Sequence, residues 1–161
     1  MKLLRSYRST WEITAFAQHI SYNPNQIAME RHGEPPAVKH FDSNMEEIAD
    51  IRNHVLHFKS SGYQLLGILC KTSQQAEFIY GELKSSGVHL VTADSTSFKE
   101  GVVITTVHLA KGLEFDEVII PFVSDPNYQS DMDKSILYIA CTRAMHRLTL
   151  TYSKEKTRFI R

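Results

Sequence analysis

The feature that most constrains the fold is a set of short, continuous apolar runs, each separated from the next by a segment with helical spacing. The clearest run is QLLGILC, residues 64–70, which shows no alternation of polar and apolar side chains. Such a run is typical of a strand in a parallel sheet that is covered on both faces. Because strand and helix patterns alternate along the whole length, we expect an α/β fold with a mainly parallel sheet and right-handed crossovers.

The other elements follow from the same criteria. Ser43 or Asn44 is a suitable N-cap for a helix that ends at Gly62, and Pro24 interrupts the helical segment that precedes it. Apolar runs predict strands and amphipathic spacing predicts helices, with strands at 37–41, 64–70, 88–91, 102–106, 118–122 and 147–153, and helices at 10–29, 44–62, 73–86 and 131–145.

Length and composition limit the class of protein. A chain of 161 residues suits one domain covering 1–161, and at this size roughly 70% of the unfolded surface can be buried. Lys plus Arg equal Asp plus Glu at 18 each, so a site for a polyanion has to be local. Cys70 and Cys141 each lie in an apolar run, which predicts buried thiols in a reducing compartment. No apolar run approaches the ~20 residues that span a bilayer, and we expect a cytoplasmic protein without a membrane partner.

The stretch TTVHLAKGLEFDEVIIP, Thr105 to Pro121, joins two apolar strands through a charged loop. Buried strands seldom flank residues such as Lys111, Gly112 and Glu114 without a functional reason. Loops at the ends of buried strands in α/β sheets commonly hold ligands, because a rigid scaffold positions their side chains beside a crevice. This loop is therefore the first candidate site, and Gly112 provides the conformational freedom for a tight turn.

Three segments place charged or aromatic residues where a core alone would not: LLRSYRST (3–10), TTVHLAKGLEF (105–115) and LYIACTRAMHRLTL (137–150). In this order they resemble the C-terminal motifs of superfamily 1 helicases of the UvrD, Rep and PcrA type, and they cover nearly all of the chain. The resemblance implies a RecA-like three-layer sandwich, which is a P-loop NTPase-like fold, used as the second motor domain (2A) of an ATP-dependent DNA helicase.

The resemblance also implies an ATP site. By position, Tyr7 stacks on the adenine, Arg8 and Arg143 reach the γ-phosphate as the catalytic arginines, and Glu114 bonds the ribose. These roles are chemically sensible because a guanidinium supplied by a neighbouring domain stabilises the charge that spreads over the γ-phosphate oxygens during phosphoryl transfer. Lys lacks the planar fork and does not replace Arg there.

By the same resemblance Thr106, His108 and Lys111 contact the backbone of single-stranded DNA. Each candidate also has an ordinary structural interpretation. For Tyr7 and Arg8 it is an exposed position at the entry of a helix. For Arg143 it is a helix surface with the guanidinium in water, and for His108 it is a histidine with hydrogen-bond partners inside the fold. Lys111 and Glu114 suit a loop ion pair of small energetic value.

Two elements of an ATPase are missing from the sequence. There is no G-x-x-x-x-G-K-[ST] motif and no apolar strand that ends in paired acids. The chain alone is therefore expected to be inactive, with ATP and its Mg²⁺ held by an N-terminal RecA-like domain of the same polypeptide. About ten residues join the strands at Val88 and Val102, where UvrD and Rep carry a large additional domain.

Other features leave alternatives open. Ser6 stands where the family commonly has Asn, and the Cys-Thr-Arg-Ala-Met-His string at 141–146 is similar to the HelD (helicase IV-like) branch, some members of which act on RNA polymerase. One alternative is therefore a non-catalytic interaction module that docks on RNA polymerase, and another is a nuclease-fused recombination or DNA repair subunit.

His54 and His57 are one helical turn apart, but no Cys or carboxylate is patterned around them to complete a zinc site, and no metal is expected.

Overall fold

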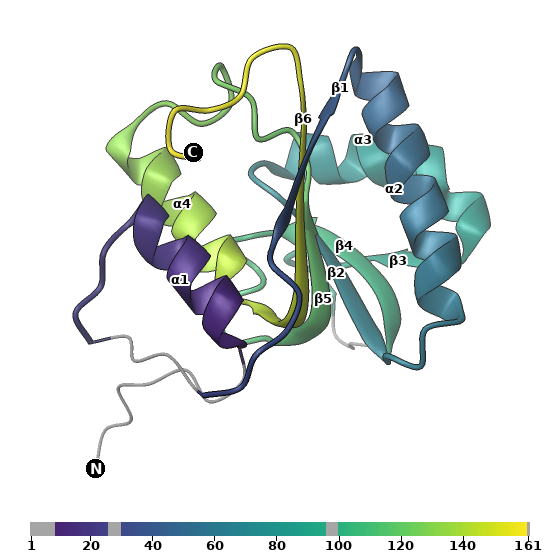
Figure 1. Ribbon diagram of the computed structural model, residues 1–161. Helices are drawn as coiled ribbons and strands as arrows, with labels where there is room; N and C mark the ends of the chain where they lie inside the picture. The colour runs from purple at the N-terminus through teal and green to yellow at the C-terminus, as the bar shows by residue number, and fades with distance from the viewer. Residues whose placement is uncertain (1–8, 26–29, 96–99, 161) are drawn as a thin grey trace.

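The computed structural model describes residues 9–25, 30–95 and 100–160, which form a three-layer α/β sandwich (Figure 1). Its sheet has the strand order β1-β6-β5-β2-β4-β3, and every pair of neighbouring strands is parallel. The strands are β1 (Ala37–Phe41), β2 (Leu65–Cys70), β3 (Val88–Leu90), β4 (Gly101–Thr106), β5 (Phe115–Ile120) and β6 (Ala144–Ser153). The expected fold class, a RecA-like three-layer sandwich with a mainly parallel sheet, is confirmed.

Helices cover both faces of this sheet. They are α1 (Trp11–Ile20), α2 (Asn44–Lys59), α3 (Ser73–Leu83), the short 3-10 helix η1 (Lys84–Ser86) and α4 (Asp131–Cys141). Figure 1 shows α1 and α4 on one face of the sheet and α2 and α3 on the other. Each face has its own buried cluster, with Ile13 and Leu137 in the first and Ile51 and Ile79 in the second. None of the helices in the described part of the chain is long and apolar enough to cross a membrane.

The helix boundaries follow local capping chemistry. Thr72 and Gln75 form a capping box at the start of α3, and Ser130 and Asp133 form another at the start of α4. The thiols of Cys70 and Cys141 are buried and free, as expected.

The expected helix at 131–145 is wrong at its end, because α4 stops at Cys141. The Thr142 hydroxyl donates a hydrogen bond to the carbonyl oxygen of Ile139 at 2.7 Å, which competes with continuation of the helix. The Arg143 carbonyl oxygen already accepts a hydrogen bond from the Phe115 backbone N–H at 2.9 Å, so the chain has entered the sheet. Arg143 therefore lies in the turn between α4 and β6 and not on a helix surface.

Gly67 in the middle of β2 provides the space for Phe115. A Cβ atom at position 67 would lie 2.8 Å from the Phe115 ring, closer than real Cβ contacts, and the ring is fully buried. A side chain at 67 would therefore displace the first residue of β5 and, with it, the loop that carries Glu114.

We predict that Gly67→Ala lowers the free energy of unfolding by about 1–3 kcal/mol, as typical overpacking of a dense core does. The matched control is Gly81→Ala in α3, where a new Cβ meets nothing within 4 Å. That substitution replaces an exposed helical glycine and should raise stability by about 0.5–1 kcal/mol. Urea denaturation of both variants checks the prediction, and a Gly67→Ala variant as stable as the wild type would contradict it.

Candidate functional site

Two opposite edges of the sheet carry the candidate residues. Glu114 precedes the first residue of β5 and Arg143 precedes the first residue of β6, so both lie at the amino-terminal edge of the parallel sheet. Thr106 ends β4 and His108 follows it, so these two lie at the carboxyl-terminal edge. Thr106 and His108 therefore lie at the edge where ligands commonly bind in α/β sheets, whereas Glu114 and Arg143 lie where strands begin.

Arg143 is held against the loop that precedes β5. Its Nη1 donates a hydrogen bond to the carbonyl oxygen of Leu113 at 3.3 Å, and its Nη2 donates to Thr142 Oγ1 at 3.4 Å. Its Nε is buried and has no hydrogen-bond partner among the described residues. A guanidinium has five N–H donors, so two long hydrogen bonds leave most of its capacity for another acceptor.

The electrostatics of Arg143 reflect its partial burial. Desolvation lowers the pKa of the Arg143 guanidinium, while the charge of the nearby Glu114 and that of Tyr138 act in the opposite direction. Arginine stays protonated in proteins, so the side chain is a cation that has lost part of its hydration. Such a group gains more from an incoming anion than a fully hydrated one does.

Glu114 and Arg143, which the sequence analysis assigned to one site, are thus brought together by the structure. Tyr7 and Arg8, assigned to the same site, lie outside the described residues. Ser9 is described and buried, and its Oγ donates a hydrogen bond of 2.6 Å to the carbonyl oxygen of Ala144. The chain therefore passes the beginning of β6, next to Arg143, one residue after Arg8.

A hollow of about 500 Å³, which we call the strand groove, lies at the carboxyl-terminal edge of the sheet. Thr106 and His108 line it, together with Lys71, Thr92 and Ala76. His108 is exposed, whereas Thr106 is nearly buried and its Oγ1 accepts a hydrogen bond from the Leu109 backbone N–H at 3.2 Å.

The remaining two candidates lie in the loop beyond His108. Lys111 is exposed. Gly112 is exposed and has a φ of 83°, a left-handed conformation that favours glycine.

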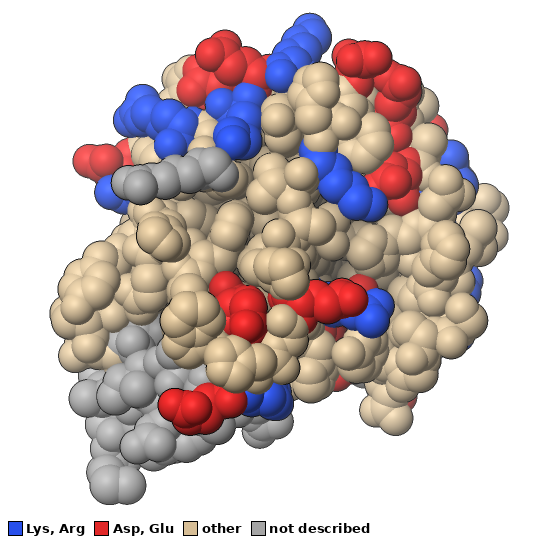
Figure 2. Space-filling model, viewed as in Figure 1, with Lys and Arg blue, Asp and Glu red and all other residues tan. Residues whose placement is uncertain are grey.

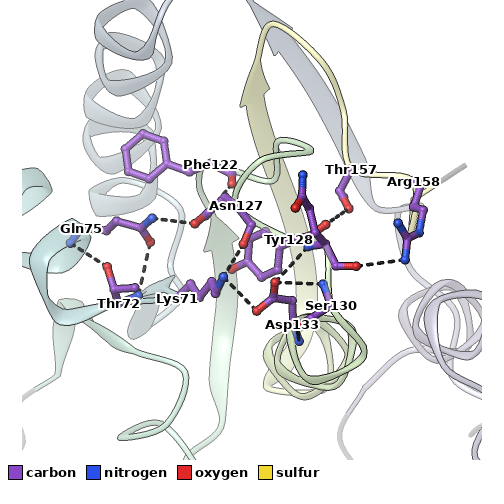
Figure 3. A network of polar contacts seen from close by, with 11 residues as sticks. Lys71, Thr72, Gln75, Phe122, Asn127, Tyr128, Ser130, Asp133, Thr157 and Arg158 are labelled. Atoms are coloured by element: carbon purple, nitrogen blue, oxygen red, sulfur yellow. Dashed lines mark hydrogen bonds and ion pairs between the residues drawn. The ribbon is translucent and has the colours of Figure 1, made fainter.

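Lys71 is a residue of the strand groove that the sequence analysis missed. It follows β2 at the same edge, and that position after a buried strand was the signal that could have found it. Its Nζ forms an ion pair with Asp133 at 2.8 Å and also donates to the carbonyl oxygen of Asn127 (Figure 3). Desolvation acts to raise the pKa of Asp133, but Lys71 and two hydrogen bonds from the backbone N–H groups of Gln129 and Ser130 together lower that pKa to about 2. Lys71 is therefore engaged within the fold.

Glu47 of α2 is a buried carboxylate that connects this helix to the residues at the carboxyl-terminal edge. Its side chain is fully buried, and its Oε1 accepts hydrogen bonds of 2.7 Å from the Phe122 backbone N–H and from Thr151 Oγ1. Its Oε2 is buried without a hydrogen-bond partner among the described residues. Desolvation raises the pKa of Glu47 and outweighs both hydrogen bonds.

We predict that Glu47→Gln becomes more stable relative to the wild type as pH rises. The raised pKa means that the folded state binds more protons than the unfolded state, so wild-type stability falls as pH increases from the unfolded-state value of about 4.3 through the folded-state pKa. The substituted amide keeps an acceptor for Phe122 and Thr151 and does not ionise. Urea denaturation from pH 4 to pH 8 measures the difference. Glu46→Gln, on the exposed side of the same turn, is the control, and a pH-independent difference for position 47 would refute the assignment.

Charge on the surface is mixed. On the face shown in Figure 2, acidic and basic side chains are interspersed, and those of the described residues form no continuous basic surface. This agrees with the balanced composition, and it means that contacts to a polyanion have to come from individual residues.

The parallel six-stranded sheet, covered by helices on both faces, defines the class of a RecA-like α/β domain. The sequence model of the UvrD-like helicase C-terminal domain matches residues 94–155. The chain is 33% identical over 70 residues to DNA helicase II of Escherichia coli K12 and to DNA helicase II of Salmonella typhimurium LT2. These alignments cover 37% of this chain and only 10% of each relative, so the match spans about a tenth of the curated relatives.

Solved structures extend the likeness over the whole domain. The C-terminal domain of a possible DNA helicase from Lactobacillus plantarum WCFS1 superimposes with a TM-score of 0.80 at 29% identity, over 96% of this chain and 91% of that one. The arterivirus nonstructural protein 10 helicase, solved with DNA, gives a TM-score of 0.54 at 12% identity over 87% of this chain and 30% of its own, which shows a shared fold. The resemblance to a UvrD-like helicase C-terminal domain is confirmed, whereas the HelD branch stays a prediction.

Proposed function

We propose that this chain is the second motor domain of an ATP-dependent DNA helicase and that it supplies Arg143 and Arg8 to ATP held by an N-terminal RecA-like domain. The observation that supports the proposal is the burial and the incomplete hydrogen bonding of the Arg143 side chain. It is half-buried at a sheet edge, close to Glu114, with a buried Nε and no strong hydrogen bond among the described residues.

The chemistry of that side chain fits the terminal phosphate of ATP. A partly dehydrated guanidinium with unused donors binds a phosphate oxygen strongly, and it stabilises the charge that develops when the terminal phosphoryl group departs. Glu114 beside it supplies a carboxylate that accepts hydrogen bonds from sugar hydroxyls. The proposed roles of Tyr7 and Arg8 rest on the resemblance, and the anchoring of Ser9 beside Ala144 supports them. Mg²⁺, when held by the other domain, would neutralise part of the charge on the phosphates.

The carboxyl-terminal edge is the proposed place for single-stranded DNA. Thr106 and His108 line the strand groove, and Lys111 is an exposed cation farther along the same loop. Residues 107–114 run from this edge to the amino-terminal edge, so one covalent segment joins the proposed DNA contacts to Glu114. ATP favours the closed pair of domains because it contacts both only when the cleft is shut, and hydrolysis removes that preference.

In the full-length protein we predict that Arg143→Lys lowers kcat for ATP hydrolysis by about 10³-fold or more, because lysine lacks the fork that stabilises the transition state. Nucleotide affinity should change much less. Arg147→Lys is the matched control, since Arg147 lies in β6, the strand that Arg143 precedes, with a side chain that is 46% exposed. Steady-state ATPase assays and binding of a non-hydrolysable analogue separate the two effects. Wild-type kcat in the Arg143 variant would remove this residue from the cleft.

We also predict that the isolated chain has no ATPase activity and binds single-stranded DNA weakly, with affinity that falls as salt rises. In Lys111→Ala the slope of log K against log salt should become shallower by about 0.7, the value for one phosphate contact on a single strand. Lys84→Ala is the control, because Lys84 is exposed at the far end of α3. Fluorescence anisotropy with a labelled oligonucleotide provides the measurement. Tight, salt-independent binding, or ATP turnover by the chain alone, would contradict the proposal.

A further inference from the structure

A second hollow, of about 480 Å³, lies at the carboxyl-terminal edge on the other side of α3 from the strand groove. We call it the amide hollow. It is an open depression bordered by the first turn of α2, the first two turns of α3 and the segment after β5. Its lining includes Asn44, Gln74, Gln75, Phe78, Phe122 and Asn127. Neither the sequence motifs nor the proposed ATP and DNA contacts use any of these side chains.

The position of the amide hollow in the topology favours a ligand. The chain leaves β2 toward α3 on one face of the sheet and leaves β5 toward α4 on the other, although β2 and β5 are neighbours (Figure 1). The two connections diverge above this pair of strands, which makes a topological switch point. In open α/β sheets the crevice at such a point is where ligands bind.

Part of the lining is fixed within the fold. Gln75 Nε2 donates a hydrogen bond to Asn127 Oδ1 at 2.9 Å, and Asn127 Nδ2 donates to the carbonyl oxygen of Phe122 at 2.9 Å. Figure 3 shows the Phe122 ring beside this amide pair. These bonds connect α3 to the segment after β5 and give the hollow a rigid wall.

Other lining groups have unused capacity. Asn44 Oδ1 accepts from Ser153 Oγ at 2.8 Å, which directs the Asn44 amide, and its Nδ2 has no hydrogen-bond partner among the described residues. The Gln74 side chain is exposed and likewise forms no hydrogen bond within the described part of the chain. Phe78 is 48% exposed on the same wall. The hollow thus offers amide donors and acceptors beside an aromatic face.

The charge of the lining decides which chemistry fits. No Lys, Arg, Asp or Glu of the described residues lines the amide hollow, so neither a phosphate nor a divalent cation finds a counter-charge there. A nucleobase fits instead, since it is a neutral planar ring that stacks on aromatic side chains and forms hydrogen bonds with Asn and Gln along its edges.

The amide hollow is also next to the strand groove. Ala76 and Glu77 of α3 line the strand groove, while Gln74 and Phe78 of the same two turns line the amide hollow. Only the width of one helix, about 10 Å with its side chains, separates them. A strand whose backbone lies in the strand groove therefore reaches the amide hollow within a few nucleotides.

We propose that the amide hollow binds an unpaired base of the same nucleic-acid strand, with Phe78 as the stacking surface and Gln74 and Asn44 as hydrogen-bonding partners of the base edge. This inference rests on the proposed contact between the strand groove and single-stranded DNA. It assigns base contacts to one hollow and backbone contacts to the other.

The test measures binding of the whole chain to oligothymidylates of about 4 and about 16 nucleotides, lengths that bracket the usual site sizes of single-strand binding folds. Phe78→Ala should weaken binding of the longer oligonucleotide by about 5- to 100-fold, the loss expected for one stacked base. Gln74→Ala should weaken it less. Neither substitution should weaken binding of an abasic oligonucleotide of the same length as the longer one. Leu56→Ala, another exposed apolar residue at 57%, is the control and should bind as the wild type does.

The outcomes separate the two proposals. If Phe78→Ala and Gln74→Ala bind the longer oligonucleotide like the wild type while His108→Ala weakens it, the base site is wrong and the strand groove stands. If the wild-type chain binds no oligonucleotide, the proposed DNA contact fails and the base site fails with it. An equal loss for the oligonucleotide without bases would also overturn the base site. Thermal unfolding of each variant confirms that the exposed substitutions leave the fold intact.

Discussion

The packing of the Phe115 ring onto the bare backbone of Gly67 determines the amino-terminal edge of the sheet. It fixes where β5 begins, and the Phe115 N–H then donates to the Arg143 carbonyl oxygen, which fixes the turn before β6. The Arg143 side chain donates in turn to the Leu113 carbonyl oxygen, so the loop and the turn hold each other. A contact in the core therefore positions the proposed catalytic guanidinium, although the guanidinium itself lies at the edge of the sheet.

The opposite edge is built differently. Most of the side chains that line its two hollows are neutral, with Lys71, Glu77 and Asp94 as the charged residues of the strand groove. Buried Glu47 ties α2 to Phe122 and Thr151. One edge thus holds a cation with unused donors, and the other holds mostly satisfied polar groups around two open hollows. That difference suits a phosphate at the first edge and a chain of neutral bases with a few phosphate contacts at the second.

The sequence predicted the architecture well, because continuous apolar runs such as 64–70 identify strands buried on both faces, and a cap such as Ser43 starts a helix through a local hydrogen bond. The helix before Arg143 was predicted too long, since the hydrogen bond from Phe115 to the Arg143 backbone is a tertiary contact without a local signal. The pairing of Lys71 with Asp133 joins residues far apart in sequence and could not be predicted, nor could the burial of Glu47. Spacing alone also did not reveal that Glu114 and Thr106 face opposite edges.

The role of Arg143 can be tested with a crystal structure of the full-length protein bound to ADP and a transition-state analogue of the γ-phosphate. We predict that the Arg143 guanidinium donates hydrogen bonds to the analogue, with Glu114 beside the ribose and the amino-terminal edge closed against the other domain. A structure in which the analogue is bound while this edge faces solvent, and in which Arg143 keeps only Leu113 and Thr142 as partners, would contradict this role.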